Sequence, residues 1–141
     1  MATVFDVAAF ILKKNGRMTT MKLQKLVYYS QAWSLVWDER PIFKEKIEAW
    51  SNGPVVKELF FAHQGELNIS EEPRGDIKKL DDDARDTINA VLKHYGDKSG
   101  QWLSALTHSE DPWRDARKGL PDGVRGNNVI THEALVNYYG F

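Results

Sequence analysis

The sequence predicts a mostly α fold with a small β-hairpin, an α+β domain built as a compact helical bundle around one buried central helix. Three observations support this prediction. Residues 18–37, MTTMKLQKLVYYSQAWSLVW, are apolar on nearly every side and contain no Gly or Pro. Several other stretches repeat apolar residues at helical spacing. Hydrophobic residues make up 42% of the 141 residues, which suits a single domain over residues 1–141.

Composition excludes several classes of protein. A formal net charge of -1 provides no general attraction to polyanions, which argues against a nucleic-acid partner. The chain contains no cysteine, so disulfides, thiolate metal sites and cysteine catalysis are excluded. We find no signal peptide pattern and no apolar run long enough to span a membrane, so we expect a cytoplasmic protein without a membrane partner.

The central helix has a clear start. The hydroxyl of Thr19 suits an N-cap, and from about Leu26 onward the pattern indicates a buried core helix. The strongly polar residues of its opening turns are Lys22, Gln24 and Lys25. We therefore expect the N-terminal end of this helix to be exposed to solvent.

The first helix and the hairpin flank this segment. Thr3 suits the cap of a helix that ends at Asn15-Gly16 and buries Val4, Val7, Ala8 and Ile11. After the central helix, the runs Pro41 to Phe43 and Ile47 to Trp50 enclose three charged residues, a pattern that predicts a β-hairpin. Trp50 is the side chain best able to anchor this hairpin on the helices.

A third helix is expected to begin at Pro54, because proline is favoured at a first helical position. Val56, Leu59, Phe60 and His63 would line one side of it, with Gly65 at its end. Residues 66–76 read as an exposed loop, and residues 67–69 form a possible third strand. His63 is expected to be packed or half-exposed.

Four further helices complete the expected bundle. Asp81 to Asp83 suit the N-terminus of a helix that buries Ala84, Ile88, Val91, Leu92 and Tyr95. Ser99 suits the cap of the next helix, and Asp111 with Pro112 suits the start of a short one. Residues 119–128 read as a glycine-rich surface loop. Thr131 suits the cap of the last helix.

Catalytic and metal-binding patterns are weak. His108, Glu110 and Asp111 provide three potential metal ligands, but their spacing does not resemble a zinc motif such as HExxH. The preferred interpretation is that His108 fixes the loop before Trp113. No activated-serine elbow or phosphate-binding loop is present. We therefore expect a protein that is not an enzyme, with no cofactor and no metal.

Cations beside aromatic residues form a candidate contact surface at the start of the central helix. Lys22 and Lys25 lie about one turn apart, and Tyr28 and Tyr29 follow within a turn. Cations beside aromatic edges can bind phosphates or stack on bases, so this helix end is a candidate for contact with a partner. The alternative is a solvated helix end whose lysine stems cover neighbouring apolar side chains.

Three segments together resemble a known family. KLQKLVYY, EAWSNGPV and THSEDPW follow one another in the order of the hallmark motifs KLQKLxYY, EAWxxGPV and THxxxPW of the Panacea domain. This domain, also called the SocA-like antitoxin domain, occurs in phage-associated GepA-like proteins. The chain departs from the family pattern at Thr20 and at Ser51-Asn52, where relatives often carry other residues.

The resemblance implies an antitoxin of a type II toxin–antitoxin system, encoded by bacteria, phages or prophages. Such a protein neutralises a cognate protein toxin by binding it, and at least one type of member also delivers its toxin to a ClpXP-type, ATP-dependent protease. Known members are not enzymes. The alternatives are a DNA-binding transcriptional regulator and, less favoured, a small hydrolase or metal enzyme.

Hallmark positions supply the candidate partner-binding residues. The helical segment contributes Lys22, Gln24, Lys25, Tyr28 and Tyr29, and the second and third motifs contribute Trp50, His108 and Trp113. Many hallmark residues must be structural. We expect the partner to contact the exposed start of the central helix, the hairpin and the segment from His108 to Trp113.

Overall fold

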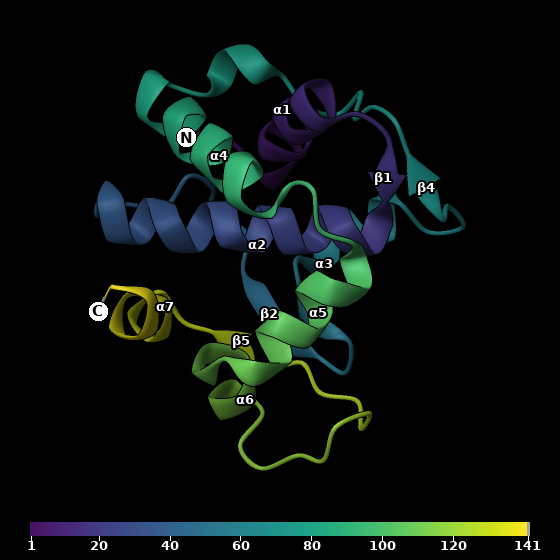
Figure 1. The fold of residues 1–141 in the computed structure, drawn as a ribbon, viewed down its shortest axis with the longest axis vertical. Helices are drawn as coiled ribbons and strands as arrows, with labels where there is room; N and C mark the ends of the chain where they lie inside the picture. The colour runs from purple at the N-terminus through teal and green to yellow at the C-terminus, as the bar shows by residue number, and fades with distance from the viewer. Residues whose placement is uncertain (141) are drawn as a thin grey trace.

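Helix α2 (Thr20–Trp37) lies across the middle of the protein (Figure 1). The computed structural model describes residues 1–140. The Thr19 hydroxyl accepts a hydrogen bond from the Lys22 amide at 3.1 Å, so Thr19 caps the helix as predicted. Every residue from Leu23 to Ala32 is buried. This confirms the prediction of a central helix that other elements surround.

Helices α1 (Val4–Asn15) and α4 (Asp82–Tyr95) cover one side of α2 (Figure 1). Thr3 and Asp6 cap each other's backbone at the start of α1, and the Asp81 carboxylate accepts the Ala84 amide at 2.8 Å at the start of α4. A short 3-10 helix, η1 (Ile77–Lys79), precedes α4. The predicted apolar faces are buried, with Val4, Val7, Ala8, Ile11, Ile88 and Val91 at most 1% exposed.

The hairpin exists, but its strands differ from those predicted. Strand β2 (Ile47–Trp50) pairs antiparallel with β3 (Gly53–Val55), so the prediction that it pairs with residues 41–43 is wrong. A side chain of α2 binds that segment instead. Gln31 accepts the Ile42 amide with its Oε1 atom and donates to the Phe43 carbonyl with its Nε2 atom, both at 2.8 Å. These bonds satisfy backbone groups for which the sequence pattern assumed a strand partner.

The helix predicted to begin at Pro54 is also misplaced. Pro54 lies in β3, at the edge of the sheet, where its missing N–H removes no essential ladder bond. Helix α3 (Lys57–Ala62) begins three residues later. Strand β5 (Val129–Ile130), which sequence analysis missed, pairs with the other edge of β2 and gives the order β3-β2-β5.

A second, two-stranded sheet joins β1 (Met18–Thr19) to β4 (Asn68–Ile69). The short strand suggested for residues 67–69 is therefore present. Helices and small antiparallel sheets together confirm the predicted α+β fold class. Within residues 1–140, no helix combines the length and apolar character needed to cross a membrane.

Helices α5 (Gly100–Ser109), α6 (Asp111–Ala116) and α7 (His132–Tyr139) lie on the side of α2 opposite to α1 and α4 (Figure 1). Ser99 and Thr131 cap α5 and α7 as predicted, at 3.0 and 3.1 Å. At α6 the cap position belongs to Glu110 rather than Asp111, one residue from the prediction. Helices α5 and α6 contact the hairpin, and α7 contacts α2 and α6.

Candidate functional site

Lys25 is buried beneath the hairpin, so the prediction that it is exposed is wrong. The residue is 1% exposed, and its Nζ atom donates to the Pro54 carbonyl oxygen at 3.1 Å. Burial lowers the pKa of Lys25 from 10.5 to about 7. A Cβ atom on Gly53 would lie 2.7 Å from the Lys25 Cε atom. A glycine at residue 53, with a φ of 121°, therefore lets the turn close over this lysine without a clash.

Gln24 and Lys22 bind backbone groups of other segments. Gln24 is buried, against prediction, and its side chain amide exchanges two hydrogen bonds with the Val56 backbone, at 2.9 and 3.1 Å. Lys22 is half-buried and donates to the Gly96 carbonyl at 2.7 Å. The opening turns of α2 therefore fasten two distant segments to the helix instead of facing solvent.

Tyr28 and Tyr29 belong to a buried cluster of phenols around one carboxylate. The hydroxyl groups of Tyr29 and Tyr139 both donate to the Glu110 Oε1 atom, at 2.6 and 2.7 Å, and the Tyr28 and Tyr139 hydroxyl oxygens are 3.0 Å apart. Burial raises the pKa of each of these three tyrosines. Burial also raises the pKa of Glu110, and the phenol hydrogen bonds oppose this effect. The cluster fixes α7 against α2.

His108 and Trp113 form a stacked pair at the junction of α5 and α6. Their ring centroids are 4.0 Å apart, and their planes differ by 2°. Trp113 donates through Nε1 to the Trp50 carbonyl at 2.8 Å, which attaches the pair to the hairpin. Burial lowers the pKa of His108, while the backbone of Asn52 opposes this shift.

Arg117 is a buried cation that sequence analysis missed. Its guanidinium carbon lies 4.9 Å from the Trp113 ring centroid, and Nη1 donates to the Ala49 carbonyl at 3.1 Å. Its Nη2 atom donates to the carbonyl oxygens of Pro121 and Val124. Arg117 therefore links α6, β2 and the loop that precedes β5.

The three candidate metal ligands point to different partners. His108 stacks on Trp113, Glu110 accepts hydrogen bonds from two tyrosines, and Asp111 pairs with Arg114 at 2.9 Å. Within the described part of the chain, no three His, Asp or Glu side chains are arranged to hold a metal ion.

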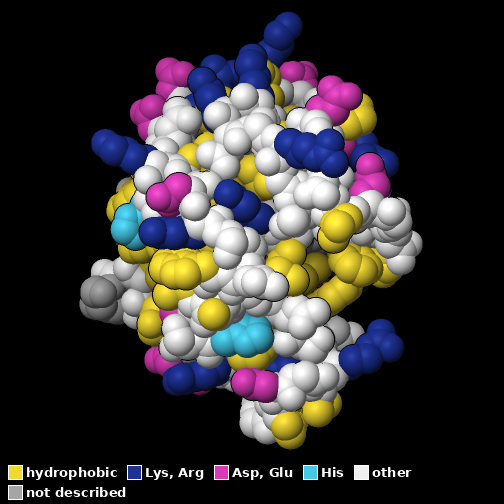
Figure 2. Space-filling model, turned by 45° about the vertical axis from the view of Figure 1, so that its right-hand side comes forward, with side chains coloured by type: hydrophobic (Ala, Val, Ile, Leu, Met, Phe, Trp, Pro, Cys, Tyr) yellow, Lys and Arg dark blue, Asp and Glu magenta, His cyan; other side chains and the backbone are white. Residues whose placement is uncertain are grey.

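A groove of about 470 Å³ opens between the start of α2, the hairpin and α3. We call it the Lys25 groove. Met21 and Phe60 are exposed at it, and the Trp50 and Phe60 rings meet edge to face at 4.9 Å. The right-hand side of Figure 1 faces forward in Figure 2, where hydrophobic side chains gather around a hollow. The residues that line the Lys25 groove are Thr20, Met21, Gln24, Lys25, Trp50, Ser51, Asn52, Val55, Phe60, His63, Gln64, Gly65 and Glu66.

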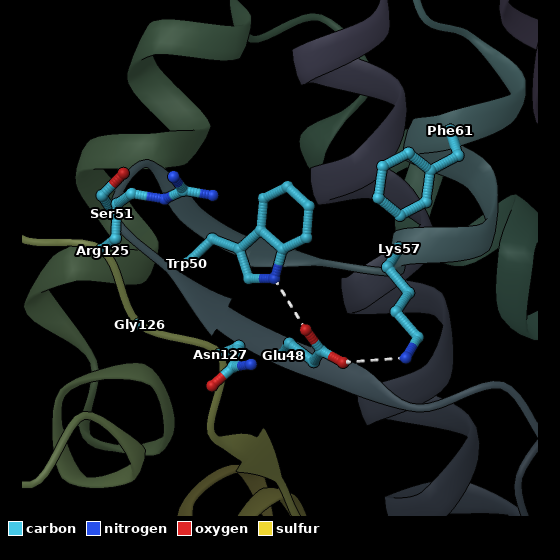
Figure 3. Close-up of a pocket in the computed structure, with 8 residues that line it drawn as sticks. All are labelled: Glu48, Trp50, Ser51, Lys57, Phe61, Arg125, Gly126 and Asn127. Carbon is cyan, nitrogen blue, oxygen red and sulfur yellow. Dashed lines mark hydrogen bonds and ion pairs between the residues drawn. The ribbon is translucent and has the colours of Figure 1, made fainter.

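A second hollow of about 580 Å³ shares Trp50 and Ser51 with the Lys25 groove (Figure 3). Trp50 donates through Nε1 to Glu48 Oε1 at 2.9 Å, and the Lys57 amine lies 3.8 Å from Glu48 Oε2. Arg125 comes from the loop before β5 and lines the same hollow. Trp50 is therefore held by a carboxylate on one side and faces both hollows.

The structure brings together three of the eight predicted site residues, Gln24, Lys25 and Trp50, in the Lys25 groove. The other five are not among the residues that line it. His63, expected to be packed or half-exposed, is buried and pairs with Glu72 at 2.7 Å.

Sequence analysis missed Met21, Phe60 and the Ser51-Asn52 turn as parts of the groove. The available signal was the adjacent pair Phe60-Phe61, because neighbouring residues of a helix point in directions about 100° apart and a surface helix tends to expose at least one of them.

Comparison with known proteins identifies similar sequences. A family model described as "Antitoxin SocA-like, Panacea domain" matches residues 23–114, a range that contains all three motifs except Lys22. The protein named "Antitoxin SocA" from Caulobacter vibrioides (strain NA1000 / CB15N) is 31% identical over 124 residues. That alignment covers 76% of this chain and 66%, just under two thirds, of the relative. No solved structure matches the chain significantly.

Proposed function

The chain belongs to the SocA-like antitoxin family with a Panacea domain, and from this premise we propose that it is the antitoxin of a type II toxin–antitoxin system. It neutralises a cognate protein toxin in the cytoplasm by binding it, and it performs no catalysis of its own. The observation that carries the proposal is the Lys25 groove, which lies almost entirely within the matched segment and has an apolar, exposed rim.

The rim of the groove has the chemistry of a protein interface. Met21 and Phe60 are 38% and 41% exposed and line the groove together with the half-buried Trp50. Phe61 is 57% exposed, packs edge to face on Phe60 and lines the adjoining hollow. Contiguous exposed apolar side chains of this size mark interaction sites, and aromatic residues dominate binding energies there. A toxin that covers this rim would remove these side chains from water.

The groove is also held in one shape before any partner arrives. Lys25 binds Pro54, Gln24 binds Val56, and Trp113 binds the carbonyl group of Trp50. The bonds to Pro54 and Trp50 fix the hairpin to α2 and α6, and the bonds to Val56 fix the residue between β3 and α3 to α2. A partner would therefore lose little free energy to the ordering of this surface, which favours tight binding.

Co-expression with the protein encoded next to this chain tests the proposal. We expect the chain to restore growth of cells that express the toxic neighbour and to elute with it as one complex. Replacing both rim residues, Met21→Ser and Phe60→Ser, should weaken the complex by roughly 10- to 100-fold. Trp37→Ser is the matched control, because Trp37 is exposed at the far end of α2. Persistent toxicity without a complex would refute the antitoxin role.

We further propose that binding delivers the toxin to an ATP-dependent protease of the ClpXP type. Pulse-chase measurement should then show a shorter toxin half-life when this chain is present than when it is absent. An unchanged half-life in cells whose growth is restored would leave occlusion of the toxin as the mechanism.

A further inference from the structure

The Lys25 amine has more hydrogen-bond donors than partners. A protonated lysine amine carries three N–H groups, and the acceptor that the structure gives it is the Pro54 carbonyl oxygen at 3.1 Å. Within residues 1–140 the ion pairs involve other side chains, so no carboxylate there neutralises Lys25. A buried cation without an opposite charge destabilises a fold, and such groups concentrate at functional sites.

Two other buried polar side chains that line the groove already have partners. Gln24 uses both ends of its amide on Val56, and His63 pairs with Glu72 at 2.7 Å. Lys25 lines the same groove and retains donor capacity. An incoming group with an opposite charge would therefore be attracted to Lys25 rather than to these two residues.

Apolar side chains flank this position. Met21 and Phe60 are exposed at the groove, and Trp50 packs against Phe60 with ring centroids 4.9 Å apart. A ligand that matches the groove is thus apolar on its flanks and carries one negative charge where it meets Lys25. A short peptide segment with one acidic side chain between apolar ones has this arrangement.

We propose that the Lys25 groove binds an apolar segment of the partner protein and that an acidic side chain of this segment pairs with the Lys25 amine. The inference rests on the proposed function, because it names the chemistry by which the toxin is recognised. The carboxylate would supply the counter-charge that the isolated chain lacks, and the apolar flanks would cover Met21 and Phe60.

Peptide titration of the full chain tests this assignment. The probes are acetyl-Leu-Glu-Leu-amide and acetyl-Leu-Gln-Leu-amide, which differ only in charge at the central side chain. NMR shifts of the Lys25 side chain and of the Asn52 and Gly53 amides report binding. We expect the glutamate peptide to bind about 10-fold more tightly, as a charge-assisted hydrogen bond predicts.

Two variants identify the residue responsible. Lys25→Met keeps a side chain of similar length without the charge, and it should abolish the preference for the glutamate peptide. Lys13→Met is the control, because Lys13 is exposed in the last turn of α1 and does not line the groove. It should keep the full preference. The wild-type comparison of the two peptides stands even if Lys25→Met fails to fold.

Several outcomes would overturn the inference. They are equal binding of the two peptides, no binding of either, and a preference that persists in Lys25→Met. Tighter binding of acetyl-Leu-Leu with a free carboxylate would assign the groove to a chain terminus and not to an acidic side chain. Growth rescue without a peptide preference would refute this inference alone, whereas a preference without a toxin complex would support it and refute the antitoxin role.

Discussion

The imidazole of His108 lies parallel to the indole of Trp113, with 4.0 Å between ring centroids and 2° between planes. Trp113 in turn donates to the Trp50 carbonyl at 2.8 Å. Residues of the second and third motifs are thereby joined, and Lys25 of the first motif reaches the same hairpin through Pro54. The three motifs thus meet at the β2–β3 hairpin and hold it in place.

Acidification should destabilise the fold through His108. Burial lowers the pKa of His108 below its ordinary 6.5, so the unfolded chain binds a proton at a higher pH than the folded chain does. The free energy of unfolding should therefore fall as the pH falls through this window. His108→Phe keeps a stacked ring without a titrating group. Urea unfolding at several pH values should show that its free energy of unfolding depends less steeply on pH than that of the wild type. His132→Gln, at an exposed position, should keep the wild-type slope; equal slopes for His108→Phe and wild type would contradict the assignment.

Lys25→Met should stabilise the isolated chain. The pKa of Lys25 is about 7 in the folded chain and 10.5 when the lysine is unburied, so the unfolded chain binds a proton more readily between these values. The penalty for burying the charge is therefore greatest below pH 7 and decreases as the pH rises toward 10.5. Methionine removes this penalty but leaves the Pro54 carbonyl without its donor, and we expect a net gain of roughly 1–3 kcal/mol at neutral pH. Urea unfolding should also show that the free energy of unfolding of the wild type rises between about pH 7 and 9 and that the variant lacks this rise. A less stable variant would show that the bond to Pro54 outweighs the buried charge.

Glu110→Ala should weaken the attachment of α7. The variant leaves the buried hydroxyl groups of Tyr29 and Tyr139 without their shared acceptor, and the expected loss is roughly 2–4 kcal/mol in the free energy of unfolding. Glu110→Gln retains an oxygen at the Oε1 position, and it should lose less than about 1 kcal/mol. Thermal and urea unfolding measure both. Similar losses in the two variants would mean that the charge, not the acceptor, stabilises the cluster.

Gly53→Ala should be more harmful than Gly65→Ala. Both glycines have positive φ, 121° and 86°, so alanine strains either turn. At Gly53 the new Cβ atom would also lie 2.7 Å from Lys25 Cε, whereas no atom lies within 4 Å at Gly65. We expect losses of more than about 2 kcal/mol and about 1 kcal/mol respectively, measured by urea unfolding. Equal losses would show that the hairpin moves away from Lys25 without penalty.

Helix starts could be predicted from the sequence because their causes are local. Thr3, Thr19, Ser99 and Thr131 each bind an amide three residues further on, and all four caps are present. Strand pairing has no such local cause. Residues 41–43 have the apolar pattern of a strand, but the Gln31 side chain satisfies their backbone. The true third strand, β5, lies about eighty residues from β2 and is only two residues long.

The candidate site was predictable in part. Trp50 was predicted to contact the partner, and it lines both hollows. Gln24 and Lys25 were chosen as hallmark residues at a helix end that was expected to be exposed, and the fold buries both. A polar side chain can be buried when a backbone carbonyl or amide lies close enough to form a hydrogen bond with it. For Gln24 and Lys25 those backbone groups are supplied by the way the hairpin closes over α2, which the local sequence does not reveal.

The pairing of β5 with β2 has a consequence for the newly made protein. Strand β2 is complete on one edge as soon as β3 follows it, but its other edge is covered by residues 129–130. During synthesis, the Ile47 to Glu48 edge must therefore wait for about eighty further residues. An open strand edge invites pairing with other chains. For a ribosome-bound chain, the interval before β5 emerges is thus the period of greatest exposure to misassembly.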